Sequence, residues 1–137
     1  MIETDLRLER LLARDEIHQL LLRLARGSDR RDAEFIASCY HEDAFDDHGG
    51  FQDSGAEFSR CVPQALAPFA ATMHFIGTPH LAFDGDVAHG EAYCQAHHVY
   101  PPSDPGGPGA TTRATLGPRR AIAPIDEGEA AGLCARP

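Results

Sequence analysis

Three polar positions fall where the surrounding pattern predicts burial or a cavity wall, and they could carry chemistry. They are Asp29, His74 within the apolar stretch "ATMHFIG" at residues 71–77, and the pair His97–His98. A buried imidazole must find hydrogen-bond partners, because an unpaired polar group in a core costs free energy. A carboxylate that holds one nitrogen of an imidazole leaves the other nitrogen able to take a proton. His74 therefore requires a polar partner elsewhere in the chain.

Each of these positions also has a purely structural interpretation. His74 could be a core histidine that bonds a backbone carbonyl, and Asp29 could be a loop residue that caps the next helix. Strand alternation places the two histidines on opposite faces. His97 lies on the same face as Tyr93 and Gln95, and His98 lies on the other. Only one of the two can therefore share a face with Tyr93.

A metal site is not favoured by the pattern. The segment "YHEDAFDDH" at residues 40–48 concentrates two histidines, one glutamate and three aspartates. A half-exposed strand normally shows such polar alternation, and no His-x-x-x-His spacing fixes ligands on one face. The four cysteines stand far apart without a C-x-x-C pair. We expect neither a metal ion nor a cofactor.

Composition limits the class of protein and its partners. The chain has 137 residues, 42% of them hydrophobic and 24% charged, which fits one globular domain with its own core. The net charge of -9, with arginine as the only basic residue type besides histidine, argues against a nucleic-acid surface or an anionic membrane face. The charged first ten residues leave no room for a signal peptide, and no apolar run is long enough for a membrane span. We expect a cytoplasmic protein.

The elements that must position these residues follow from periodicity and capping signals. Helical spacing predicts an amphipathic helix over residues 8–26 that stops at Gly27, and Asp32 is an expected N-cap for a short second helix. Ser54 and Glu57 form the pattern of a capping box, which opens a third helix through about residue 69 with a kink or early stop at Pro63.

Extended segments dominate the second half of the chain. They are a short strand with a Gly-Gly turn at residues 43–51, the strand that contains His74, a hairpin turn at 84–86 and an extended run at 87–100. Helices followed by strands indicate an α+β domain over residues 1–100. Residues 101–137 are rich in Pro, Gly and Ala without a convincing period, so we expect an irregular tail.

Two longer stretches carry a resemblance to a known family. "ARDEIHQLLLRLARGSDRRDAEFIASCYHEDAFDDHGGF" and "ATMHFIGTPHLAFDGDVAHGEAYCQAHHVY" resemble the SnoaL-like branch of the nuclear-transport-factor-2-like superfamily. The resemblance covers about residues 5–100. It implies helices packed on a curved, mostly antiparallel sheet, which together form a cone with an internal pocket.

The resemblance also implies roles for individual residues. In the scytalone dehydratase and hexachlorocyclohexane dehydrochlorinase relatives, the corresponding aspartate and histidine form a dyad that removes a proton, which implies the same roles for Asp29 and His74. His97 is similar to a second histidine of the dehydratase pocket. Pocket-lining, substrate-binding positions are expected at three further residues: Tyr40, His48 and Tyr93.

The expected function is a cofactor-free lyase or isomerase that takes a small hydrophobic cyclic substrate. The alternatives are a non-catalytic ligand-binding or dimerisation module of the same fold, and a small scaffold subunit of a ring-hydroxylating oxygenase. Relatives commonly self-associate through the outer face of the sheet. We therefore expect a homodimer or homotrimer in which the small residues Ala92, Cys94 and Ala96 form the contact.

The C-terminus departs from the family. Relatives usually continue after the Pro-rich loop with two further strands, and nothing after residue 109 matches their pattern. The last strands of the sheet are therefore expected to be missing, which would leave an unpaired edge. One hypothesis is that this stretch is translated out of frame, and resequencing of the coding region tests it.

Overall fold

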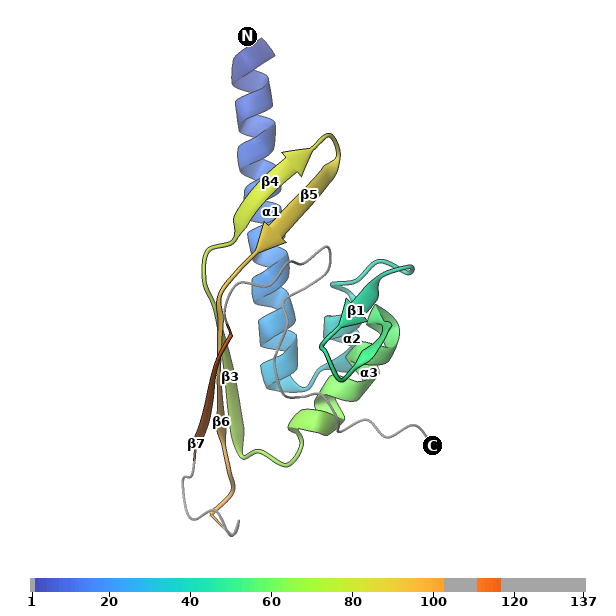
Figure 1. Cartoon of the computed structure of the whole chain (residues 1–137), viewed down its shortest axis with the longest axis vertical. Helices are drawn as coiled ribbons and strands as arrows, with labels where there is room; N and C mark the ends of the chain where they lie inside the picture. Colours follow the sequence, from blue (N-terminus) through green and yellow to red (C-terminus); the bar gives the residue numbers. More distant parts are fainter. Residues whose placement is uncertain (1, 103–110, 117–137) are drawn as a thin grey trace.

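One long helix forms the axis of the molecule, and the other elements pack around it (Figure 1). The computed structural model describes residues 2–102 and 111–116. The helices are α1 (Ile2–Arg30), α2 (Ala33–Ala37) and α3 (Gly55–Leu66). The strands are β1 (Phe45–Asp47), β2 (Gln52–Ser54), β3 (Ala71–Ile76), β4 (His80–Asp84), β5 (Val87–Glu91), β6 (Cys94–Val99) and β7 (Thr111–Leu116).

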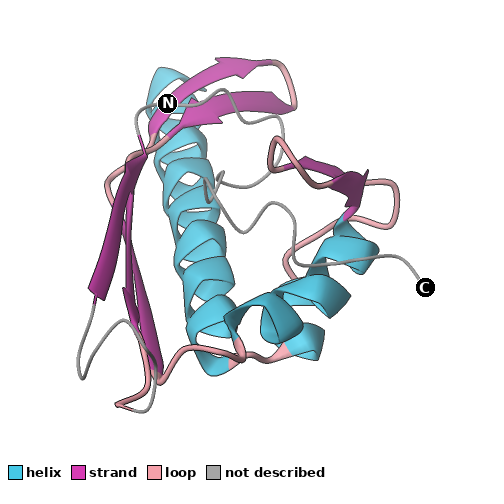
Figure 2. Ribbon diagram, turned by 60° about the horizontal axis from the view of Figure 1, so that its bottom comes forward, coloured by secondary structure: helices cyan, strands magenta, loops and turns pink. Residues whose placement is uncertain are grey.

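These elements confirm the predicted α+β class. Figure 2 shows α1 between the β3–β6–β7 sheet on one side and α2, α3 and the β1–β2 hairpin on the other. Strands β3, β6 and β7 are antiparallel neighbours, and β1–β2 and β4–β5 form separate two-stranded hairpins. Across the described residues the strands do not close into a barrel, so the helices cover one face of an open sheet.

Helix α1 runs past the predicted stop at Gly27 and ends at Arg30. Gly27 has a packing role instead, because a Cβ there would lie 2.9 Å from Ile36 Cγ1 on α2. The chain leaves the helix one residue after Arg30, where Arg31 adopts a φ of 55°. The extension matters for the site, because it puts Asp29 in the last turn of a helix rather than in a loop.

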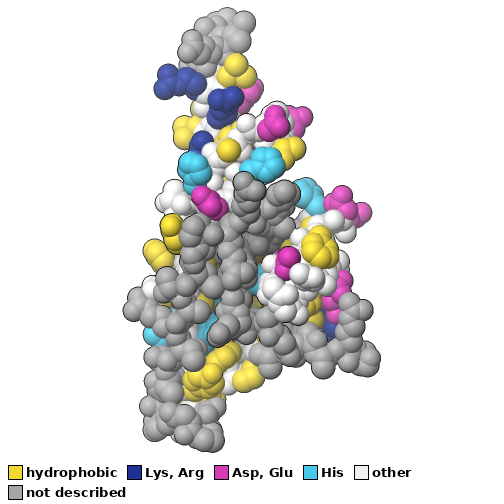
Figure 3. Space-filling model, in the orientation of Figure 1, with side chains coloured by type: hydrophobic (Ala, Val, Ile, Leu, Met, Phe, Trp, Pro, Cys, Tyr) yellow, Lys and Arg dark blue, Asp and Glu magenta, His cyan; other side chains and the backbone are white. Residues whose placement is uncertain are grey.

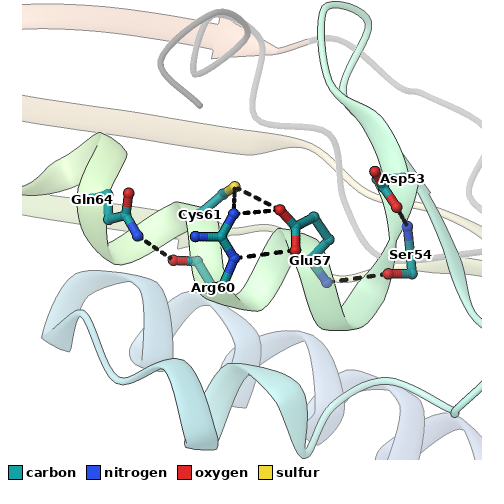
Figure 4. Close-up of polar contacts among 6 residues, drawn as sticks. All are labelled: Asp53, Ser54, Glu57, Arg60, Cys61 and Gln64. Atoms are coloured by element: carbon teal, nitrogen blue, oxygen red, sulfur yellow. Dashed lines mark hydrogen bonds and ion pairs between the residues drawn. The ribbon is translucent and has the colours of Figure 1, made fainter. Parts of the chain in front are cut away.

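Capping side chains start α2 and α3 as predicted. Asp32 accepts a hydrogen bond from the Phe35 backbone N–H at 3.0 Å, and Ser54 accepts one from the Glu57 N–H at 3.2 Å (Figure 4). Helix α3 includes Pro63 and ends at Leu66, three residues before the predicted end. The apolar faces of these helices and α1 form the main core, a cluster of buried residues comprising Leu24, Ile36, Cys39, Phe58, Val62 and Leu66.

The C-terminal part of the sheet differs from the expectation. Residues 111–116 form β7, which pairs with β6 along its whole length, from Cys94 opposite Leu116 to Val99 opposite Thr111. The prediction of an irregular tail is therefore wrong for this segment, and at least one further strand is present. The remainder of the predicted tail, residues 103–110 and 117–137, lies outside the described residues.

The small residues of β6 lie on the opposite face of the sheet from the one predicted. Cys94 and Ala96 are buried and point toward α1, where Cys94 packs with Ala25 and Ile76 in a second core cluster. The opposite, outer face of β3 carries Met73 and Phe75, which are exposed. The predicted contact through small residues is therefore wrong in its location, and self-association through the outer face stays a prediction.

The N-terminal part of α1 extends beyond the β4–β5 hairpin and exposes apolar side chains. Leu6, Leu8, Leu11 and Leu12 are each more than half exposed, and Figure 3 shows hydrophobic and arginine side chains side by side at this end of the molecule. Arg14 joins the helix to the hairpin by donating a hydrogen bond to the Leu81 carbonyl at 3.1 Å. No helix in the described part of the chain is both long and apolar enough to cross a membrane.

Candidate active site

The carboxylate of Asp29 links the end of α1 to strand β3. Its Oδ1 accepts hydrogen bonds from the Thr72 hydroxyl at 3.0 Å and from His74 Nδ1 at 2.7 Å. Its Oδ2 accepts one from the His74 backbone N–H at 3.1 Å. Three donors from two residues of one strand therefore fix the carboxylate, and the predicted proximity of Asp29 and His74 is present in the structure.

This contact determines which nitrogen of His74 can act as a base. An ionised carboxylate only accepts hydrogen bonds, so Nδ1 carries the hydrogen and Nε2 has the basic lone pair in the neutral ring. The His74 side chain is fully buried, whereas one quarter of the Asp29 side chain is exposed. The pair lies at the boundary between the interior and the surface, with the carboxylate partly exposed and the imidazole buried behind it.

An open cleft of about 480 Å³ adjoins the pair. Five of its six lining residues come from the second half of α1, at positions one helical turn or less apart, and the sixth comes from β3. They are Leu22, Ala25, Arg26, Asp29, Arg30 and His74. The cleft therefore combines an apolar wall, a carboxylate–imidazole pair and two guanidinium groups.

The histidine that lies beside His74 is His98, and the predicted placement of His97 is wrong. In the antiparallel β3–β6 ladder, Thr72 lies opposite His98, His74 opposite Ala96, and Met73 opposite His97. Residues directly opposite one another share a face, so His97 lies on the outer face with exposed Met73. The rings of His74 and His98 lie edge to face with centroids 5.4 Å apart.

Aromatic packing holds His98 in place. Its ring stacks on Phe69 with centroids 4.5 Å apart and an interplanar angle of 29°, and Phe69 also contacts Tyr100. Phe69 in turn packs against the main core. Sequence reasoning considered the pair His97–His98 but chose His97, and it did not single out Thr72. The alternation signal that separates His97 from His98 was present, but the register with β3 decides which of them faces α1.

Tyr40 and His48 belong to a different polar cluster, which surrounds Asp46. The Tyr40 hydroxyl donates to Asp46 Oδ2 at 2.8 Å, and His48 Nδ1 forms an ion-pair contact with Asp46 Oδ1. The His48 ring stacks on Phe58 at a centroid distance of 4.4 Å. The cluster is buried between the β1–β2 hairpin and α3, and none of its members lines the cleft beside His74.

Tyr93, the last predicted site residue, lies away from the cleft. Its side chain is 61% exposed, and its backbone carbonyl accepts a hydrogen bond from the Gly77 N–H at 2.8 Å. It precedes β6 and follows the same alternation as Gln95 and His97, which face outward. Of the six predicted residues, the structure therefore brings Asp29 and His74 to the cleft, Tyr40 and His48 to the hairpin, and His97 and Tyr93 to the outer surface.

Two groups outside the cleft have shifted pKa values. Burial raises the pKa of the Cys39 thiol, against the opposing effects of the nearby Arg23 charge and a hydrogen bond with Ser38. The hydrogen bond and charge of Glu57 raise the pKa of the Arg60 guanidinium on α3 (Figure 4). Cys39 is therefore protonated at neutral pH and does not supply a thiolate nucleophile.

The described residues offer no grouping of three or more His, Cys, Asp or Glu side chains that could hold a metal ion. The acidic segment around residues 40–48 uses Asp46 and His48 to bind each other. Asp47 accepts hydrogen bonds from the Gly49 N–H and the Gln52 amide. Local hydrogen bonding accounts for these side chains.

Comparisons with known proteins agree with this architecture. Residues 9–117 match the SnoaL-like domain family, and the chain belongs to that family. No curated protein matches the chain. A solved structure of the Kfla4162 protein from Kribbella flavida is similar, with a TM-score of 0.66 and 20% identity over 74% of each chain.

Two other solved structures share the fold. One is a protein of the NTF2-like family from Streptomyces avermitilis, provisionally assigned as a dehydratase, with a TM-score of 0.60 and 16% identity over 74% of this chain and 78% of that one. The other, from Novosphingobium aromaticivorans, is provisionally assigned as a scytalone dehydratase. It has a TM-score of 0.60 and 15% identity over 94% and 97% of the two chains.

Proposed function

We propose that the protein is a cofactor-free lyase or isomerase that removes a proton from a carbon atom next to a carbonyl group. One observation carries the proposal. The Asp29 carboxylate accepts a hydrogen bond from His74 Nδ1 at 2.7 Å at the edge of a cleft of about 480 Å³. The dehydratase assignments of two proteins with the same fold support this class of reaction.

The proton moves from substrate carbon to His74 Nε2. The electron pair of the broken C–H bond shifts toward the carbonyl and forms an enolate, while the ring becomes an imidazolium. Asp29 stabilises this imidazolium through Nδ1, and Thr72 and the His74 backbone N–H keep the carboxylate in position. The enolate then expels a leaving group from the adjacent carbon, as in a lyase, or takes the proton back at another carbon, as in an isomerase.

His98 supports the base rather than touching the substrate. Its ring lies edge to face with that of His74 and stacks on Phe69, so it keeps the imidazole in position, and the His74 imidazolium returns its proton to the departing group. Leu22 and Ala25 provide an apolar wall for the carbon skeleton. Together these groups favour a cyclic or polycyclic ketone as substrate.

Hydrogen exchange in deuterated water tests the proposal without knowledge of the full reaction. The protein is incubated with a panel of steroid, polyketide-derived and halogenated cyclic ketones, and α-deuterium incorporation or elimination is followed by mass spectrometry. For a ketone that reacts, His74→Gln should reduce the rate about 10²- to 10⁴-fold, because it removes the positioned base.

His97→Gln is the matched control, since it makes the same change on the opposite face of the same sheet. It should retain the wild-type exchange rate. Equal losses in the two variants, or full activity of His74→Gln, would contradict the assignment of His74 as the base.

A further inference from the structure

Two arginines in the cleft have no role in the proton transfer described above. Arg26 and Arg30 are one helical turn apart on α1, so their side chains project from the same face of the helix. Both line the cleft together with Asp29 and His74. The row continues one turn earlier with Leu22, which also lines the cleft.

Two other arginines of α1 contact neighbouring residues, whereas Arg26 and Arg30 are exposed. Arg14 donates to the Leu81 carbonyl and covers the Phe83 ring, and Arg23 donates to Ser38 Oγ and covers the Phe35 ring. Within the described part of the chain, Arg26 and Arg30 form neither a hydrogen bond nor an ion pair. Their positive charges are therefore available to a group that enters the cleft.

The acidic groups of the cleft balance only part of the positive charge of the two arginines. Asp29 is the only acidic residue among the described cleft-lining residues, and its oxygens already accept three hydrogen bonds from Thr72 and His74. Two like charges one turn apart also repel each other and destabilise the helix. An anion bound between the two guanidinium groups would relieve the repulsion.

We propose that Arg26 and Arg30 bind an oxyanion group of the substrate, a carboxylate or a phosphate ester. A guanidinium presents two parallel N–H donors that match the oxygens of either group. The apolar part of the substrate then lies against Leu22 and Ala25, with its acidic C–H toward His74. The position of that C–H rests on the proposed function. The substrate class is thereby narrowed to an anionic cyclic compound.

The anion also favours the proposed chemistry. Two guanidinium groups beside His74 oppose the imidazolium that forms when its ring takes a proton. A bound oxyanion offsets this positive charge and so assists the transfer. A neutral hydrophobic ketone of the same shape lacks this effect and leaves the arginines unpaired.

Three probes of similar size test the binding site by titration calorimetry, without any need for turnover. They are naphthalene-2-carboxylate, 2-naphthyl phosphate and the neutral naphthalene-2-carboxamide. We expect at least one anionic probe to bind about tenfold or more tightly than the carboxamide at low salt, and this difference to shrink as salt is added. The relative affinities of the carboxylate and the phosphate identify the preferred oxyanion.

Substitutions locate the binding to the cleft. Arg26→Gln and Arg30→Gln should each weaken the anionic probe about tenfold and leave carboxamide binding unchanged. Arg10→Gln is the matched control, because Arg10 is an exposed arginine of the same helix that does not line the cleft. Circular dichroism verifies that each variant keeps its helical content.

Equal affinity for the charged and neutral probes would overturn the proposal, as would equal losses in Arg10→Gln and Arg26→Gln. The outcome is separable from the proposed function. Selective anion binding that depends on Arg26 and Arg30 supports the site even if no ketone is turned over. Turnover of neutral ketones that is unaffected by either substitution overturns the site while the role of His74 stands.

Discussion

The molecule contains two histidine–aspartate pairs with almost the same local chemistry. In each pair Nδ1 of the imidazole contacts an aspartate oxygen, and a hydroxyl group from another residue donates to the same carboxylate. The surroundings differ. The side chains of His48 and Asp46 are 1% and 0% exposed, whereas Asp29 is 25% exposed and opens with His74 onto the cleft.

The connection through the chain differs as well. Asp46 and His48 are two residues apart, at the end of β1, so their contact belongs to one hairpin. Asp29 and His74 are 45 residues apart and join the last turn of α1 to β3. Residue types alone therefore do not separate the proposed catalytic pair from the one that holds the hairpin. Access to the cleft makes one pair suitable for proton transfer, and burial makes the other suitable for holding the hairpin to α3.

The largest expected effect comes from making the same substitution in both pairs. Asp29→Asn should reduce turnover about 10³- to 10⁴-fold, because an amide can hold the imidazole in the wrong tautomer and cannot stabilise the imidazolium. Asp46→Asn should leave turnover per folded molecule close to that of the wild type. The measurement is the α-deuterium exchange rate, normalised to the folded fraction.

A comparable loss of normalised rate in both variants would contradict this division of roles. It would indicate that the Asp46 cluster also contributes to the reaction. Retention of full activity by Asp29→Asn would leave His74 without the orienting partner that the hydrogen bond at 2.7 Å indicates.

The second largest expected effect is on stability, and here the Asp46 pair should matter more than the Asp29 pair. Asp46→Ala should lower the free energy of unfolding by about 3–5 kcal/mol, because it leaves the buried His48 and the hydroxyl of the half-buried Tyr40 beside an empty position. Asp29→Ala should cost about 1–2 kcal/mol, because one quarter of the Asp29 side chain is exposed and water can replace part of the carboxylate. Urea denaturation followed by circular dichroism gives both values. Equal losses would show that exposure does not separate the pairs.

The sequence was sufficient for the features set by local rules. Asp32 and Ser54 mark the helix starts because their side chains cap backbone N–H groups of the same segment. The resemblance to the family paired Asp29 with His74. In these cases the signal lies within a few residues or is carried by the family as a whole.

Other features depended on contacts that no local pattern contains. His97 and His98 are chemically identical neighbours, and only the register of β6 against β3 places His98 beside His74. Helix α1 passes through Gly27 because Ile36 packs against that position, which outweighs the weak helix propensity of glycine. Asp46 and His48 have the spacing of two that puts side chains on one strand face, but the sequence interpretation of this acidic segment was a half-exposed strand, which did not predict that both would be buried.

The smallest expected effect concerns the hydroxyl group that supports each aspartate. Thr72→Val removes the donor to Asp29, and a hydrogen bond to a charged group is worth about 1.5 kcal/mol or somewhat more. Because the carboxylate remains and His74 still holds it, the expected result is about a tenfold lower exchange rate with little change in stability. Thr72 is a positioning residue, so Thr72→Ser, which keeps the hydroxyl, should restore most of the rate.

Tyr40→Phe makes the corresponding change in the other pair. It removes the hydroxyl that donates to Asp46 at 2.8 Å and retains the ring that packs on Phe58. We expect a loss of about 1.5 kcal/mol in the free energy of unfolding and an unchanged exchange rate. If Thr72→Val instead lowered only stability while Tyr40→Phe lowered only the rate, the roles of the two pairs would have to be exchanged. The cleft argues against that exchange, because it is lined by Asp29 and His74, with the Asp29 carboxylate partly exposed, whereas the Asp46 pair is buried and does not line it.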